Sequence, residues 1–150
     1  MSKKNKVYIA SDHAGVELKQ IITQELANWE WINLGPDTKD SVDYPDFAEK
    51  LCNKVITENG KGVLICATGI GMSITANKIE GIRAAHVENP TSAKLTREHN
   101  DSNVLCIGAL FLEPKTAKQI VETWLETNFS QETRHQNRID KISAIEKGKK

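Results

Sequence analysis

Short runs of strand-forming residues alternate with segments of helical spacing, and this alternation limits the fold more than any other feature of the chain. Each run is apolar and rich in β-branched residues, and the stretch after it has one apolar face. Such a rhythm is typical of a parallel sheet whose strands are connected by helices. We therefore expect an α/β fold, with a Rossmann-like, doubly wound, five-stranded parallel sheet and helices on both faces. The expected strands are Lys6–Ser11, Trp31–Leu34, Gly62–Ala67, Ile82–Val87 and Asn103–Ile107.

Apolar spacing and prolines locate the helices between these strands. Leu18, Ile22 and Leu26 recur every four residues, so the first helix should bury one face. Pro90 and Pro114 each follow a strand and open a helical run, where a missing N–H costs little.

An extra C-terminal helix is expected over residues 131–147. Ile139, Ile142 and Ile145 lie along one stripe of this segment, and no strand follows it. An apolar stripe needs a surface to pack against. Residues 148–150 are expected to fray.

Composition narrows the class of protein. A chain of 150 residues that is 39% hydrophobic suits a single domain over 1–150. Basic and acidic residues are equal at 20 each, so no overall field favours nucleic acid or an anionic membrane as a partner. The first apolar stretch, Val7–Ala10, is too short for a signal peptide or a membrane span, so we expect a cytoplasmic protein. The three cysteines show no C-x-x-C spacing, which argues against disulfides and structural zinc.

Ligands of open parallel sheets bind beyond the carboxyl ends of the strands, so the residues at strand ends are candidates for a site. Ser11–Gly15 follow the first strand and Cys66–Ser73 follow the third. His99–Asp101 stand directly before the fifth strand, and we expect them at the same crevice.

The turn Thr68–Gly71 leads from a strand into a helix, where backbone N–H groups can face an anion. An equally acceptable interpretation is a tight connection without a ligand. Dinucleotide binding is less favoured, because the loop after the first strand holds Asp12 and His13 and a single glycine.

Cys66 stands beside this turn, where a nearby helix N-terminus favours the thiolate that a general base requires. By residue type alone, an inert core cysteine is the more common outcome. Cys52 and Cys106 fit that second description, because they fall within apolar helical and strand patterns.

Three histidines differ in their placement. His99 is expected to close a helix, where it could either shuttle protons or act as a C-terminal cation. His13 is expected at a helix start, where a neutral ring could donate a hydrogen bond to an anion. His86 lies within a strand and is predicted to be a core residue.

Arg134 and Arg138 are one helical turn apart with His135 between them, so both guanidinium groups could converge on one phosphate. The alternative is a solvated basic face.

Taken together, these segments resemble type B ribose-5-phosphate isomerases, a family shared with allose-6-phosphate and galactose-6-phosphate isomerases. The similarity extends over nearly the whole chain. The matching motifs are Ser-Asp-His-Ala-Gly at 11–15, Asp-Tyr-Pro at 43–45, Cys-Ala-Thr-Gly-Ile-Gly-Met-Ser at 66–73, Ala-Asn-Lys at 76–78, Gly-Ile-Arg-Ala at 81–84, Arg-Glu-His-Asn-Asp at 97–101 and Arg-His-Gln-x-Arg at 134–138.

This resemblance implies an aldose–ketose isomerase of the non-oxidative pentose phosphate pathway that acts on ribose 5-phosphate through an enediolate. Cys66 would be the base and His99 would help to open the sugar ring. The resemblance also implies an enediolate-binding turn made of Ala67, Thr68, Gly69, Ile70 and Gly71. The side chains that would bind the substrate are Asp12, His13, Tyr44 and Asn100, with Arg134 and Arg138 on the phosphate. No metal and no cofactor are expected, and the family pattern is a homodimer or homotetramer with sites shared between subunits.

Two alternatives remain open at this stage. The substrate could be allose 6-phosphate or galactose 6-phosphate; the cysteine at 66 favours the pentose over the galactose phosphate, and allose 6-phosphate stays possible. A non-catalytic nucleotide-binding protein of similar shape could also use the glycine turn, but it has no need of Cys66 and His99. One departure from the family is Leu110, where many relatives carry an arginine.

Overall fold

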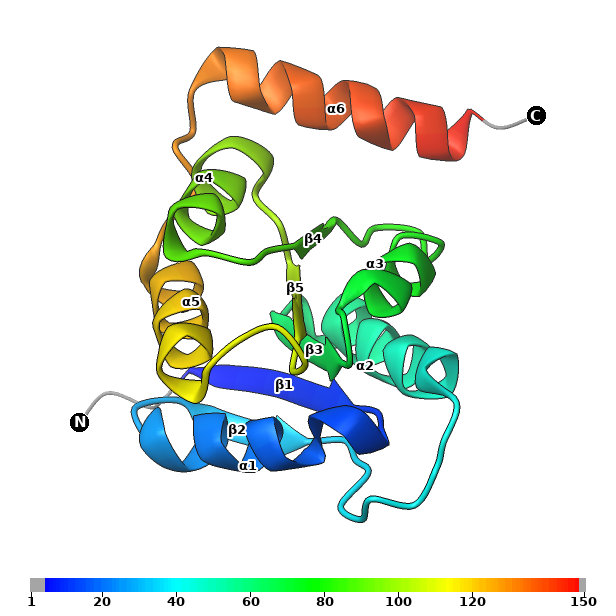
Figure 1. Cartoon of the computed structure of the whole chain (residues 1–150). Coiled ribbons are helices and arrows are strands. Elements are labelled where there is room, and N and C mark those ends of the chain that lie inside the picture. The colour runs from blue at the N-terminus through cyan, green and yellow to red at the C-terminus, as the bar shows by residue number, and fades with distance from the viewer. Residues whose placement is uncertain (1–4, 149–150) are drawn as a thin grey trace.

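The computed structural model describes residues 5–148, which form a five-stranded parallel sheet in the order β2-β1-β3-β5-β4 (Figure 1). The predicted fold class is therefore confirmed. The strand bounds are β1 Lys6–Ser11, β2 Glu30–Asn33, β3 Gly62–Cys66, β4 Ala84–His86 and β5 Val104–Gly108.

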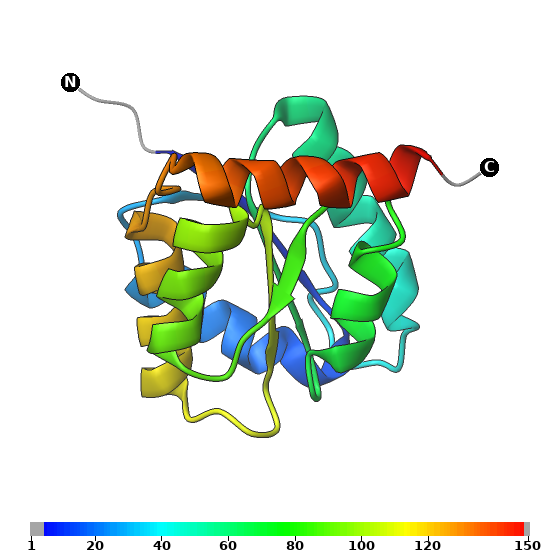
Figure 2. The same ribbon diagram turned by 90° about the horizontal axis from the view of Figure 1, so that it is seen from above.

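Helices cover both faces of the sheet. One face packs against α1, α4 and α5, and the other against α2 and α3 (Figures 1 and 2). The bounds are a short 3₁₀ turn at His13–Gly15, α1 Val16–Glu25, α2 Tyr44–Glu58, α3 Ile70–Ala76, α4 Pro90–Asn100, α5 Pro114–Glu126 and α6 Thr133–Lys147. Pro90 and Pro114 open α4 and α5 as predicted. No helix among residues 5–148 has the length and apolar character needed to cross a bilayer.

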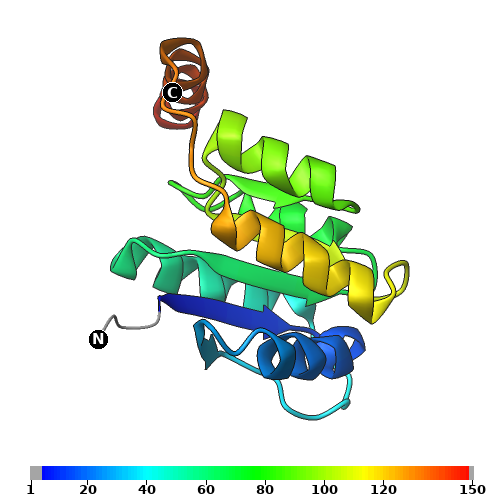
Figure 3. The same cartoon turned by 90° about the vertical axis from the view of Figure 1, so that its left-hand side faces the viewer.

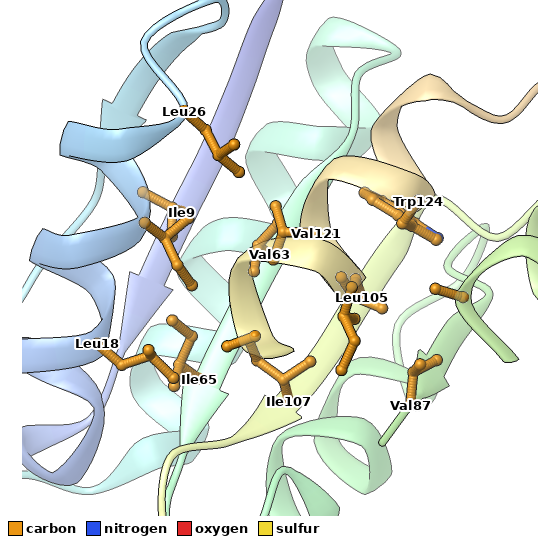
Figure 4. Packing of buried hydrophobic residues seen from close by; sticks show 14 of the residues in the cluster. Ile9, Leu18, Leu26, Val63, Ile65, Val87, Leu105, Ile107, Val121 and Trp124 are labelled. Atoms are coloured by element: carbon orange, nitrogen blue, oxygen red, sulfur yellow. The ribbon is translucent and has the colours of Figure 1, made fainter. Parts of the chain in front are cut away.

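The central strands are buried on both sides, because helices lie above and below them. On the α1 and α5 side, Ile65, Leu105 and the fully buried Trp124 belong to one cluster of buried side chains (Figure 4). The indole N–H of Trp124 donates to Ser102 Oγ at 2.9 Å, so the ring is buried without an unpaired donor. The opposite face holds Cys52 and Cys106.

Cys52 and Cys106 are inert core thiols, as predicted. Burial raises the pKa of Cys52 to about 12 and also raises that of Cys106 well above its ordinary value. Neither is a thiolate near neutral pH.

The edge strand β4 is shorter than the predicted Ile82–Val87. The N–H of Arg83 donates to the side-chain oxygen of Asn103 at 2.8 Å, which interrupts the ladder before the strand begins. On the outer side, Asn77 donates to the carbonyl of Ala84 at 3.0 Å and accepts from its N–H at 2.9 Å. This side chain therefore takes the place of a further strand.

The C-terminal helix α6 lies at the amino end of the sheet, away from the strand arrowheads (Figure 3). Its Glu146 carboxylate accepts a hydrogen bond from the N–H of Gly81, in the segment just before β4. Of the predicted stripe, Ile139 is buried, whereas Ile142 and Ile145 are 48% and 69% exposed. The stripe is thus only partly covered within one chain. The predicted fraying includes residues 149 and 150, which lie outside the described residues.

Candidate active site

The turn after β3 holds the sulfur of Cys66 next to backbone donors. Gly69 has a φ of +81°, and its N–H donates to Cys66 Sγ at 3.1 Å. A side chain at Gly69 would bring its Cβ within 2.8 Å of the Ile107 carbonyl carbon, so both space and backbone conformation require glycine. The hydroxyl of Thr68 accepts from the N–H of Ile70 at 3.2 Å, which leaves its own hydrogen available to a ligand.

A cavity of about 380 Å³ opens beside this turn at the carboxyl end of the sheet. Cys66 is 5% exposed, so its sulfur is sheltered from bulk water but lies at the cavity wall. Within residues 5–148, no group accepts a hydrogen bond from the N–H of Gly71. The cavity is lined by Asp12, Tyr44, Cys66, Ala67, Thr68, Ile70, Gly71 and Ile74.

Asp12 and Tyr44 are positioned by local hydrogen bonding and by close packing. The carboxylate of Asp12 caps the 3₁₀ turn by accepting from the N–H of Ala14 at 2.9 Å. Tyr44 is the first residue of α2, and its ring lies so close to Gly71 that an added Cβ would be 2.5 Å from Tyr44 Cζ. The cavity therefore combines a thiol, a carboxylate, a phenol and a free backbone donor.

The ring of His13 is oriented by a backbone hydrogen bond. Its Nδ1 accepts a hydrogen bond from the N–H of Val42 at 3.2 Å, so the neutral ring carries its proton on Nε2.

His99, Asn100, Arg134 and Arg138 lie at the opposite end of the sheet from Cys66. The expectation that His99–Asp101 share a crevice with Cys66 in one chain is wrong. The helix α4 runs antiparallel to the strands, so its last turn, which ends at Asn100, reaches the amino end of β5. Four residue steps of β3, from Gly62 to Cys66, separate the two ends, a span of about 13 Å.

The side chains around His99, at the amino end of the sheet, contact one another. The ring centroids of His99 and His135 are 4.4 Å apart, and His135 Nδ1 lies 2.7 Å from Ser130 Oγ. Burial and the neighbouring Arg134 and His99 lower the pKa of His135, so its ring is neutral at neutral pH. Arg134 pairs with the carboxylate of Glu132 at 2.9 Å.

Arg134 and Arg138 are exposed on α6 one turn apart, as the spacing predicted. Nearby, Asn100, Ile142 and Ile145 line a groove of about 560 Å³ between α6, α4 and β4. Asp101 is structural, because it ends α4 in a left-handed conformation and its carboxylate accepts from Arg97 at 2.8 Å. The candidate residues of one chain therefore lie in two separate groups, one at each end of the sheet.

His86 was predicted to be a core residue, and that prediction is wrong. It is the last residue of β4 and is exposed, with Nε2 2.8 Å from the carbonyl oxygen of Thr68. The position of His86 at the carboxyl end of a strand is the sequence signal that could have marked it as a candidate site residue. Among residues 5–148 there is no group of three or more His, Cys, Asp and Glu side chains that could hold a metal ion.

The loop after β5 borders the same turn. Ala109 N–H donates to the Cys66 carbonyl and Leu110 N–H to the Ala67 carbonyl, both at 2.9 Å. The side chain of Leu110 is largely solvent-exposed, since the residue is 70% accessible. The loop is thus tied by its backbone to the segment that carries Cys66.

Comparison with known proteins gives a consistent result. A family model described as Ribose/Galactose Isomerase matches residues 7–142. A putative sugar phosphate isomerase of Bacillus subtilis, YwlF, is 48% identical over 94% of this chain and 97% of its own length. Ribose-5-phosphate isomerase B of Escherichia coli is 41% identical over 94% of this chain and 96% of its own.

Solved structures agree in fold over the full chain. Ribose-5-phosphate isomerase B of Clostridium thermocellum superposes with a TM-score of 0.93 at 42% identity, covering 97% of this chain and 99% of that one. The Mycoplasma genitalium enzyme, solved with bound ribulose 5-phosphate, has a TM-score of 0.91 at 40% identity and covers the same shares.

Proposed function

The chain belongs to the ribose/galactose isomerase family, and from this premise we propose that it interconverts ribose 5-phosphate and ribulose 5-phosphate without a metal or another cofactor. The observation that carries the proposal is the sulfur of Cys66 at the wall of a cavity, beside the donors of the turn after β3. The Mycoplasma genitalium relative solved with ribulose 5-phosphate supports this choice of substrate. A nucleotide-binding role would leave Cys66 without a purpose.

In the proposed reaction, the Cys66 thiolate removes the proton from carbon 2 of the open-chain aldose. The electron pair of that bond forms the carbon–carbon double bond of an enediolate, and negative charge moves to oxygen 1. Cys66 then returns the proton to carbon 1, while the hydroxyl proton on oxygen 2 passes to oxygen 1. The N–H of Gly71 and the hydroxyl of Thr68, both at the cavity, would stabilise the negative oxygen, a contribution that often dominates catalysis.

We further propose that a second subunit completes each site. His99, Asn100, Arg134 and Arg138 are too far from Cys66 to act on the same small substrate within one chain. Exposed apolar residues are present at both ends. Ile70 and Ile74 flank the cavity, and Ile142 and Ile145 line the groove that contains Asn100. A homodimer or homotetramer in which these surfaces meet would bring the two sets together.

A substrate comparison in EDTA tests the proposed activity. We expect the purified protein to isomerise ribose 5-phosphate with a higher kcat/KM than allose 6-phosphate or galactose 6-phosphate, and to keep full activity after dialysis against the chelator. The measurement is ketose formation at several concentrations of each sugar. Preference for a hexose phosphate would refute the assigned substrate, and activity that returns only with a divalent ion would refute the metal-free mechanism.

Leu110 gives a test of where the phosphate lies. If the loop after β5 faces the phosphate, Leu110→Arg should lower KM for ribose 5-phosphate by about one decade. The value of kcat should change little, because phosphate binding is similar in ground and transition states. Arg138→Ala should raise KM instead. Unchanged KM together with a lowered melting temperature would show that Leu110 packs against another subunit rather than near the phosphate.

A further inference from the structure

The peptide unit between Thr68 and Gly69 links two side chains that are distant in sequence. Because a trans peptide is planar, its C=O and N–H point in opposite directions. The N–H, which belongs to Gly69, donates to Cys66 Sγ at 3.1 Å. The carbonyl, which belongs to Thr68, lies 2.8 Å from His86 Nε2. The peptide therefore sits between the histidine ring and the sulfur.

The hydrogen bond from His86 has a defined direction. A carbonyl oxygen can only accept, so His86 must carry its proton on Nε2. The Glu88 carboxylate lies 3.9 Å from the same nitrogen, which is too far for a hydrogen bond. His86 ends β4 at the carboxyl edge of the sheet, and Glu88 follows two residues later.

Two glycines next to the Thr68–Gly69 peptide have no space for a side chain. An added Cβ at Gly108 would be 2.5 Å from the Thr68 carbonyl oxygen, so a side chain there would displace the carbonyl from His86. An added Cβ at Gly69 would be 2.9 Å from His86 Cδ2. Two glycines thus let the histidine ring approach the peptide.

We propose that His86 is a positioning residue that acts on Cys66 through the Thr68–Gly69 peptide. By holding the carbonyl, His86 fixes the direction in which the Gly69 N–H points and strengthens that donor through the shared peptide. A fixed donor at the sulfur favours the thiolate, which is the form that removes the substrate proton. The inference rests on the proposed role of Cys66 as the base and extends it to a residue outside the cavity lining.

The test compares His86→Leu, which cannot donate, with His86→Gln, whose amide can. The first readout is alkylation of Cys66 by iodoacetamide as a function of pH, followed by mass spectrometry of the peptide that contains Cys66, with no sugar present. Cys52 and Cys106 are fully buried and serve as internal controls. We expect the alkylation midpoint of His86→Leu to move upward by roughly half to one pH unit, with His86→Gln close to the wild type.

The second readout is steady-state kinetics with ribose 5-phosphate. His86→Leu should lower kcat roughly three- to tenfold with little change in KM, and His86→Gln should recover most of the loss. Glu88→Gln is the matched control, since it removes a neighbouring charge but leaves the Nε2 donor, and it should stay close to the wild type. The other titratable groups around Cys66 are Asp12, Tyr44 and Cys106, and none of these variants alters them.

An unchanged alkylation midpoint in His86→Leu would overturn the proposal, as would equal losses of kcat in the leucine and glutamine variants. His86→Ala serves the same comparison if His86→Leu fails to fold. Alkylation needs no substrate, so it still decides the role of His86 even if the protein proves inactive on every sugar phosphate. Failure of the proposed function and failure of this inference are therefore distinguishable.

Discussion

Cys66→Ala is expected to lower kcat for ribose 5-phosphate by roughly two to four orders of magnitude, the range found when a general acid–base group is lost. The variant should still bind the sugar phosphate, because alanine leaves the backbone of the turn and the free Gly71 donor in place. Isothermal titration with ribose 5-phosphate separates binding from turnover. The substitution removes a single sulfur atom from a residue at the cavity wall, so the fold should tolerate it.

The two other cysteines provide matched controls for this experiment. Cys52→Ala and Cys106→Ala remove the same atom from buried positions at which the thiol has no chemical role. We expect both variants to retain activity with a modest loss of stability. Turnover in Cys66→Ala comparable to that of these controls would refute Cys66 as the base.

Mixing two inactive variants is expected to restore activity if each site is shared between subunits. One parent is Cys66→Ala, and the other carries both His99→Ala and Arg138→Ala. In a hybrid dimer, one site receives both defects and the other receives none. After denaturation and refolding at equal amounts, about half of the dimers should be hybrids with one intact site each, which gives about a quarter of the wild-type activity.

The control mixture combines Cys66→Ala with Thr68→Ala, two changes at the same end of the sheet. No pairing of these subunits produces an intact site, so the mixture should show only the activity of its parents. A quarter of the activity in the first mixture and none in the second supports a shared site. Equal behaviour of the two mixtures would mean that every site lies within one chain.

The sheet and its helices could be predicted because their signals are local. Strands such as Gly62–Cys66 are apolar throughout, since helices cover both sides, and the intervening helices each show one apolar face. The short β4 could not be predicted, because its start depends on Asn103, whose side-chain oxygen accepts a hydrogen bond from the N–H of Arg83.

The candidate site was predicted in part. The residues of the cavity follow β1 and β3 or open α2, so the rule for strand ends identified most of them. His99 was misplaced because it was grouped with residues that follow strands, although it precedes β5. A residue directly before a strand lies at the amino end, so the sequence did contain the information needed.

Lys19 illustrates what local sequence cannot provide. Its side chain is almost fully buried, with the residue 1% exposed, and Nζ donates to the carbonyl of Pro36. Burial lowers the pKa of Lys19, and the nearby Asp37 partly offsets this effect. A lysine on an apolar helix face usually extends its amine to water. Only the three-dimensional path of the loop after β2 provides the carbonyl that allows this one to be buried.

The side chain of Asn77 against Ala84 has a consequence for how copies of this chain can associate. An exposed sheet edge is a template for adding strands from other molecules, which leads to aggregation. Here the N–H and C=O of Ala84 are already occupied, and only two residues of a three-residue strand are left beyond it. This edge is too short to hold an incoming strand, so fibre-like stacking through β4 is disfavoured.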